Sequence, residues 1–182
     1  MPGPVCANVR GLSLTLIPKN ANTAMRVAVL EGIGVDRPEQ RRHTALALGA
    51  PTGFVATFFR DPVERAVSCW ADKLCREAAG TRGLCDHGFR VGMSFGEFVE
   101  HLTVARDGDV HTRAQHLLTP PPDYAGRVER LAEDWERLRR RFGWLAPLRV
   151  RNAAPRPDVN PEPYRAAIRR LYREDVELWE RA

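Results

Sequence analysis

Two short apolar runs in the sequence are predicted to form β-strands. Residues 11–17 (GLSLTLI) are apolar and partly alternating, and residues 53–59 (GFVATFF) are aromatic, β-branched and apolar. Runs of this length and composition are typical of strands. The second run is apolar on both faces, as expected of a strand inside a parallel sheet that helices cover. Residues 148–150 form a third, shorter strand candidate.

Helical periodicity follows each of the two main strands. Asn22 or Thr23 can cap a helix that extends to about Glu31 and ends at the glycines behind it. Pro62 then opens a helix with an apolar stripe at helical spacing, formed by Val63, Ala66, Val67, Trp70 and Leu74. Strands that alternate with helices predict an α/β fold with a parallel sheet and right-handed crossovers.

Further helices are predicted over residues 38–49, 94–102, 131–142 and 161–179. Ser94 and Glu97 have the spacing of a capping box. Residues 81–92 and 106–123 are expected to be loops, and a loop as long as the second is more often functional than structural. No shift in composition marks a boundary, so we expect a single domain over residues 1–182.

Composition and charge exclude several classes of protein. Of the 182 residues, 43% are hydrophobic and 28% are charged, which excludes disordered and fibrous chains. The formal net charge of +5 suits an anionic ligand, but both signs are mixed along the chain, so it does not require nucleic acid. No apolar stretch is long enough for a signal peptide or a membrane span. We therefore expect a cytoplasmic protein with no membrane segment.

The cysteines are not expected to bind a metal. Four cysteines in a chain of this length are too few for a disulfide scaffold. Cys75, Cys85 and His87 could suggest zinc, but no C-x-x-C pair accompanies them. Reduced thiols and no metal site are the expectation.

The segment after the first strand has the chemistry of an anion site. It reads Ile17-Pro18-Lys19-Asn20-Ala21-Asn22-Thr23. A loop that enters a helix N-terminus presents backbone N–H groups and the positive end of the helix dipole. Lys19 adds a cation, Thr23 adds a hydroxyl, and Ala21 is small enough for close approach. Glycine is absent and the lysine comes first, unlike a nucleotide P-loop, so a loop with a solvated lysine fits the spacing equally well.

A second anion candidate follows the 53–59 strand. Arg60 comes at the end of that strand, and Ser68 lies about two turns into the next helix. A guanidinium can bind an anion through two hydrogen bonds, and a hydroxyl can add a donor. The alternative is that Arg60 pairs with Asp61 or Glu64 and that Ser68 is a small packing residue. Ligands of parallel α/β sheets bind beyond the carboxyl ends of the strands, which both segments follow.

Together the two segments resemble the signature sites of sulfotransferases that use 3′-phosphoadenosine-5′-phosphosulfate (PAPS). The patterns are Pro18-Lys19-(three residues)-Thr23 and Arg60-x-Pro62-x-x-Arg65-x-x-Ser68-x-Trp70. They look like the 5′-phosphosulfate loop and the 3′-phosphate motif of that family, most closely of its carbohydrate subgroup. Later segments are similar to the same subgroup: residues 110–115 and 124–129, Asp134, Arg151-Asn152 and Tyr172-x-x-Asp175.

The resemblance implies a P-loop-like, three-layer α/β fold with a central parallel sheet flanked by helices, and PAPS as the sulfuryl donor. It implies that Arg60 and Ser68 bind the 3′-phosphate. It also implies that the 5′-phosphosulfate is bound by Lys19, Asn20, Ala21, Asn22 and Thr23. The family usually has Gly, Ser or Cys near position 22 and often Ser or Asn at position 24, so Asn22 and Ala24 depart from its pattern.

Sulfuryl transfer of this kind needs charge neutralisation and a base. Lys19 is expected to neutralise the leaving phosphate oxygen, and no metal is needed for that purpose. His43 precedes the second strand, where the resembling heparan 2-O enzymes have a catalytic histidine, and His111 lies in a segment that matches the family's His-containing region. Either histidine, or a carboxylate such as Glu39, is a candidate base for the acceptor hydroxyl.

Two other functions fit the sequence less well. A nucleotide kinase would need Ser or Thr directly after its P-loop lysine, but Asn20 follows Lys19. A nucleic-acid-binding module would need a clustered basic face with exposed aromatics, whereas the only lysines are Lys19 and Lys73 and the arginines are spread between acids. The sequence favours transfer to a carbohydrate or small-molecule hydroxyl, and it leaves the oligomeric state open.

Overall fold

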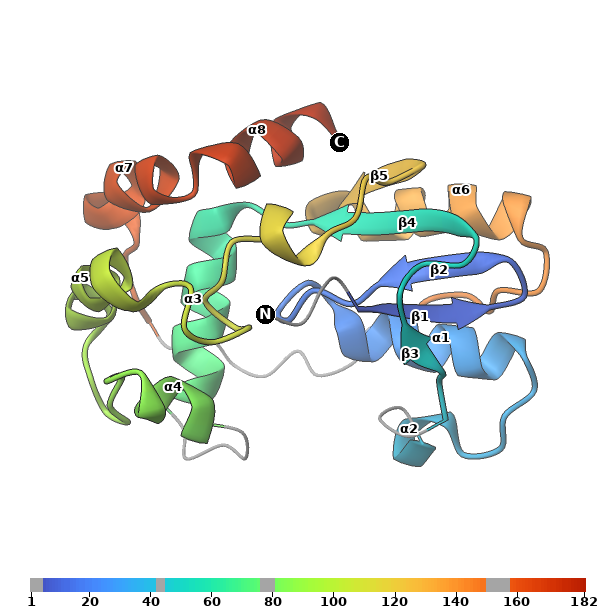
Figure 1. Cartoon of the computed structure of the whole chain (residues 1–182), viewed down its shortest axis with the longest axis horizontal. Helices are drawn as coiled ribbons and strands as arrows, with labels where there is room; N and C mark the ends of the chain where they lie inside the picture. Colours follow the sequence, from blue (N-terminus) through green and yellow to red (C-terminus); the bar gives the residue numbers. More distant parts are fainter. Residues whose placement is uncertain (1–4, 42–44, 76–80, 150–157) are drawn as a thin grey trace. The chain divides into compact units, whose positions relative to one another are not determined.

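The computed structural model describes residues 5–41, 45–75, 81–149 and 158–182. The chain divides into two compact units, and each is described by itself. The first unit comprises residues 1–59, 118–153 and 182, and the second comprises residues 60–117 and 154–181. Figure 1 shows the strands of the first unit and the helices of both. The predicted single domain over residues 1–182 stays a prediction.

The first unit contains a five-stranded mixed sheet in the order β3-β1-β2-β4-β5 (Figure 1). Strands β2 (Leu12–Thr15), β4 (Phe54–Phe59) and β5 (Tyr124–Arg127) are parallel to one another. β1 (Cys6–Val9) pairs antiparallel with both β2 and β3 (Leu48–Gly49). The prediction of an α/β fold is confirmed, but the sheet is only partly parallel.

The antiparallel part of the sheet arises from a two-residue turn. Arg10 and Gly11 connect β1 to β2, and both have positive φ angles, of 45° and 83°. Two residues with φ > 0 form the type of turn that matches the twist of a hairpin, and only antiparallel strands can be joined by so short a link. The sequence prediction missed β1 because its four residues carry no clear alternation.

The two faces of this sheet differ in polarity. Leu12, Leu14, Ala56 and Phe58 share one face and form a buried cluster with side chains of α1 (Asn22–Gly32) and α6 (Leu131–Arg141): Met25, Ala28, Val29, Trp135 and Leu138. The intervening positions include buried hydroxyls, and the Thr57 hydroxyl donates to Thr15 Oγ1 at 2.8 Å. This hydrogen bond offsets the cost of burying both groups.

The second unit is helical. It contains α3 (Pro62–Lys73), α4 (Arg82–Asp86), α5 (Phe95–Ala105), α7 (Glu162–Leu171) and α8 (Arg173–Arg181). Its core joins α3 to α5, where the rings of Trp70 and Phe95 meet edge to face with centroids 5.5 Å apart. The capping box of Ser94 and Glu97 is confirmed, since each side chain bonds the backbone of the other residue.

Several predicted elements differ from the structure. The helix predicted over residues 38–49 is limited to α2 (Pro38–Arg41), and Leu48 and Gly49 form β3 instead. The segment predicted as a loop over residues 81–92 contains α4. Within the long segment predicted as irregular lies a short 3-10 helix, His116–Leu118, and another, Val128–Arg130, links β5 to α6.

The strand candidate over residues 148–150 is wrong for Leu148 and Arg149, which are in no strand, and Val150 lies outside the described residues. The long C-terminal helix is interrupted at Tyr172, where ψ is 39°. The Tyr172 side chain is buried, and its hydroxyl donates to the Thr112 carbonyl at 2.6 Å. The break therefore places this aromatic side chain in the core.

Gly53 allows the β1–β2 turn to approach β4 closely. Phe54 N donates to the Gly11 carbonyl oxygen at 2.9 Å, and a Cβ added at Gly53 would lie 2.3 Å from that oxygen. We expect Gly53→Ala to lower the free energy of unfolding by about 1–3 kcal/mol, the usual cost of overpacking. Urea unfolding measures this change. Gly143→Ala is the control, because a Cβ there meets no described atom within 4 Å, and equal stability of the two variants would contradict the prediction.

Candidate functional site

In the first unit, the loop between β2 and α1 is shaped to present backbone N–H groups. Lys19 and Ala21 have φ angles of 71° and 58°, in the left-handed region that non-glycine residues rarely adopt. Ala21 is the N-cap of α1, and within the described structure the helix start has neither a side-chain cap nor an acid in its first turn. Such an N-terminus, preceded by left-handed residues, favours an anion.

Asn20 attaches this loop to the neighbouring strand. Its side chain is fully buried, and Nδ2 donates to the Phe58 carbonyl at 2.8 Å, while its backbone N donates to Ile17 O at 3.2 Å. Phe58 is the penultimate residue of β4, and Arg60 follows it by two residues in the sequence. Asn20 therefore fixes the loop at the carboxyl end of the strand that leads into the second candidate segment.

Asn22 and Thr23 lie in the first turn of α1 and are half-buried. The Asn22 Oδ1 atom is buried and has no hydrogen-bond partner among the described residues. This amide oxygen can accept a hydrogen bond from a bound donor group or from a water molecule. Of the predicted loop residues, Lys19 and Asn20 lie in the turn after β2, Ala21 is the N-cap, and Asn22 and Thr23 begin α1.

In the second unit, Arg60 is held by its backbone. Its N–H donates to Gln115 Oε1 at 3.0 Å, and Gln115 Nε2 donates back to the Arg60 carbonyl at 2.9 Å. The guanidinium Nη2 lies 3.9 Å from a Glu64 carboxylate oxygen, which is long for a hydrogen-bonded ion pair. The predicted alternative, pairing with Glu64, is therefore present as a long ion pair.

Ser68 lies on the Glu64 side of α3. It comes four residues after Glu64 on the helix and is half-buried, so it lies on the same face of α3 as Glu64, whose carboxylate is 3.9 Å from the Arg60 guanidinium. Asp61 caps the same helix by accepting from Val63 N at 2.7 Å. Arg60 therefore precedes the capped start of α3, and Ser68 lies in the middle of that helix.

Arg65, the second arginine of the motif, has a structural position. It is buried, and its guanidinium donates to the carbonyls of Val110 at 3.3 Å and Arg113 at 2.9 Å. These carbonyls flank His111 and Thr112. Arg65 therefore fixes the turn that carries a predicted base.

His111 has a carboxylate partner. Asp109 Oδ1 accepts from the His111 backbone N at 2.8 Å and lies 2.7 Å from ring Nδ1. Burial raises the pKa of Asp109, but the hydrogen bonds and positive potential of His111, with a smaller contribution from His87, outweigh it and lower the pKa overall. The carboxyl is therefore ionised at neutral pH, and an ionised Asp109 favours a proton on His111 Nδ1.

The other described histidine in this segment, His116, is occupied at both ring nitrogens. Nδ1 lies 2.8 Å from Asp175 Oδ1, and Nε2 lies 3.1 Å from Glu174 Oε2. Asp175 is fully buried and also accepts from the backbone N–H groups of Gln115 and His116, at 2.7 Å and 2.9 Å. The motif residue Asp175 therefore supports the segment that carries Gln115.

The sequence did not single out Asp109, and it gave Arg65 and Asp175 only as motif positions, without the supporting contacts that the structure shows. The spacing D-x-H is the local signal that could have identified Asp109. His43, together with Arg151 and Asn152 of the resemblance, lies outside the described residues.

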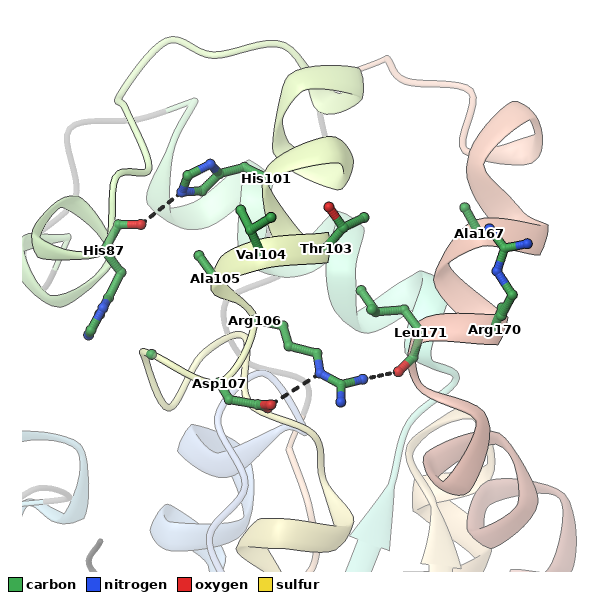
Figure 2. Close-up of a pocket in the computed structure, with 11 residues that line it drawn as sticks. His87, His101, Thr103, Val104, Ala105, Arg106, Asp107, Ala167, Arg170 and Leu171 are labelled. Carbon is green, nitrogen blue, oxygen red and sulfur yellow. Dashed lines mark hydrogen bonds and ion pairs between the residues drawn. The ribbon is translucent and has the colours of Figure 1, made fainter.

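The second unit also contains an open pocket of about 870 Å³, shown in Figure 2. On its wall Arg106 donates from Nε to Asp107 Oδ2 at 3.1 Å and from Nη1 to the Leu171 carbonyl, which links the end of α5 to α7. His101 Nε2 lies 2.8 Å from the His87 carbonyl oxygen. The lining has more arginine and histidine than acid, so it favours a polar or anionic group over a cation.

A family model described as "Sulfotransferase family" matches residues 38–180, which is most of the chain. The chain belongs to the sulfotransferase family. It is therefore a transferase, and its reaction class is sulfuryl transfer. The matched range contains Arg60, Ser68 and His111 and begins after the Lys19 loop. No match was found among curated proteins or among solved structures.

The family match gives no support to the kinase alternative. Over the described ranges of this sulfotransferase, no helix is long and apolar enough to cross a membrane. In the same ranges, His, Cys, Asp and Glu side chains form no group of three that could ligate a metal, and Cys75 and Cys85 are exposed cysteines outside any disulfide.

Asp175 provides a test of how the Gln115 segment is supported. We expect Asp175→Ala to lower the free energy of unfolding by at least about 2 kcal/mol, because buried N–H donors lose their acceptor. Glu174→Ala is the matched control: its carboxylate is exposed, and a surface pair with His116 contributes only about 0–1 kcal/mol. Chemical denaturation compares the two, and similar losses would contradict the role given to Asp175.

Proposed function

We propose that this sulfotransferase transfers a sulfuryl group from PAPS to a hydroxyl of a carbohydrate or small natural product. The family match over residues 38–180 carries the proposal, because it covers the Arg60–Ser68 motif and the His111 segment. The net charge of +5 is consistent with a strongly anionic donor. We further propose a P-loop-like fold, since β2, β4 and β5 are parallel and a loop and helix follow β2. A cytoplasmic location is also part of the proposal.

The 5′-phosphosulfate of the donor would bind at the β2–α1 loop. Support comes from the left-handed residues Lys19 and Ala21 and from the α1 start, which has no side-chain cap hydrogen bond. In this assignment Lys19 supplies charge, and Thr23 and the backbone N–H groups supply donors. The Asn20 Nδ2 atom donates to the Phe58 carbonyl. Through this atom Asn20 therefore holds the loop in place and does not itself contact the phosphosulfate.

The 3′-phosphate would bind at the start of α3. Glu64 and Ser68 share one face of that helix by their spacing, and the Arg60 guanidinium lies 3.9 Å from the Glu64 carboxylate. Gln115 holds the Arg60 main chain, and the Arg60 side chain is 10% exposed, so its packing already limits the freedom that it would lose on binding an anion. The Arg60 side chain is therefore expected to contribute more than a surface arginine would.

In the proposed reaction the acceptor oxygen forms a bond to sulfur while the bond from sulfur to the 5′-phosphate oxygen breaks. The acceptor hydroxyl proton passes to the base, and the products are a sulfate ester and adenosine 3′,5′-bisphosphate. Lys19 stabilises the negative charge on the leaving oxygen. His111 is favoured as base because Asp109 holds its Nδ1, while His43 and Glu39 remain the alternatives from the sequence.

The donor assignment predicts selective binding of the bisphosphate product. Adenosine 3′,5′-bisphosphate should raise the melting temperature of the wild-type chain more than ATP does. Arg60→Ala should weaken its binding by about 1.5–3 kcal/mol, the value of a hydrogen bond to a charged group, as measured by calorimetry. Arg140→Ala, which changes an exposed arginine on α6, is the control. Equal stabilisation by ATP, or unchanged affinity in Arg60→Ala, would refute the 3′-phosphate site.

The role of Lys19 predicts a large kinetic defect without unfolding. Lys19→Ala should reduce sulfuryl transfer from radiolabelled PAPS by about 10²–10³-fold, the usual loss when a preorganised charge-stabilising donor is removed. The only other lysine, Lys73, pairs with Asp72 at the end of α3 and offers a matched control, Lys73→Ala. The assignment fails if the two variants transfer sulfate at the same rate.

A further inference from the structure

Asp109 and His111 form a largely buried pair in which one carboxylate oxygen contacts both the backbone and the ring of the histidine. We propose that Asp109, seated against Gly83, is a positioning residue that presents His111 Nε2 to the acceptor hydroxyl as the base of the transfer. This inference rests on the proposed function, because it names what orients the base of that reaction.

Asp109 binds His111 at two points. The same oxygen, Oδ1, accepts from the backbone N–H at 2.8 Å and faces ring Nδ1 at 2.7 Å. A ring bonded through Nδ1 to a carboxylate carries its proton there, so Nε2 keeps the lone pair that accepts a proton. The His111 side chain is 21% exposed, so the ring is not sealed inside the protein.

The second carboxylate oxygen explains why a glycine occupies position 83. A Cβ added at Gly83 of α4 would lie 2.3 Å from Asp109 Oδ2, so any larger residue must displace the carboxylate. The Asp109 side chain is 12% exposed, which leaves it little room to move elsewhere. On the other side, the His87 ring packs on Gly108, where an added Cβ would meet it at 2.5 Å.

The turn around His111 is fixed independently of Asp109. Arg65 donates to the carbonyls of Val110 and Arg113, and the Tyr172 hydroxyl donates to that of Thr112. Removing the Asp109 carboxylate should therefore change the ring's orientation and tautomer more than the path of the chain. His116 differs, because carboxylates face both of its ring nitrogens and leave neither for a substrate.

Nitrogen-15 NMR of labelled histidine tests the ring directly and needs no acceptor. The His111 signals, identified by their loss in His111→Ala, should show a proton on Nδ1 and none on Nε2 in the wild-type chain. Asp109→Asn should shift the population toward the other tautomer, whereas Asp107→Asn, in the same turn but paired with Arg106, should not. A wild-type ring protonated at Nε2 alone would overturn the proposal.

Kinetics then test the consequence for transfer. The probe is radiolabelled PAPS with the best acceptor from a panel of desulfated glycosaminoglycan oligosaccharides and simple glycosides. Asp109→Asn should lower kcat by about 10²–10⁴-fold, the range of general base catalysis, with little change in the KM for PAPS. Gly83→Ala should lower kcat in the same direction, and Gly143→Ala should not. A normal kcat in Asp109→Asn would refute the positioning role.

Different results would refute the proposed sulfuryl transfer and the role of Asp109. A wild-type chain that binds no adenosine 3′,5′-bisphosphate would refute the proposed function. Intact bisphosphate binding in Asp109→Asn with unchanged kcat or unchanged His111 tautomer would refute only the role of Asp109. Should Gly83→Ala fail to fold, Asp109→Asn, which keeps the side-chain shape, still decides the matter.

Discussion

The irregular segment between α5 and β5 depends on side chains that satisfy its backbone hydrogen-bonding groups. Arg65 binds two of its carbonyls, Tyr172 binds a third, and Asp175 accepts from two of its N–H groups. Gln115, within the segment, in turn accepts from the backbone N–H of Arg60 and donates to its carbonyl. Because a buried backbone group without a partner is costly, these contacts give a chain without regular structure a defined path.

This dependence explains why two charged residues of the second unit, Arg65 and Asp175, are buried. Arg65 and Asp175 are 4% and 0% exposed, and each uses its charge on backbone groups of the segment. Isolated, such charges would destabilise the fold; with several hydrogen bonds each, they order the turn that carries His111. Arg65, the second arginine of the Arg60–Trp70 motif, is therefore part of the support for His111.

The parts of the fold that could be predicted are those with local signals. Capping at Ser94 and the apolar stripe after Pro62 appear in windows of a few residues, and both are confirmed. β1 and β5 were missed because CANV and YAGR have weak strand propensity and form through pairing with β2 and β4. Contacts such as Gln115 to Asp175 join residues 60 apart in the chain, and no local pattern contains them.

The reciprocal bond between Gln115 and the Arg60 backbone has a consequence for evolution. Both amide atoms of Gln115 bond main-chain groups, so the side chain at position 60 can change without breaking the pair, while position 115 cannot accept a residue that lacks either a donor or an acceptor. A lineage that changed the side chain at position 60 would keep its glutamine. Substitution at 115 would instead require a compensating change along the segment, which makes it an unfavourable first step in diversification.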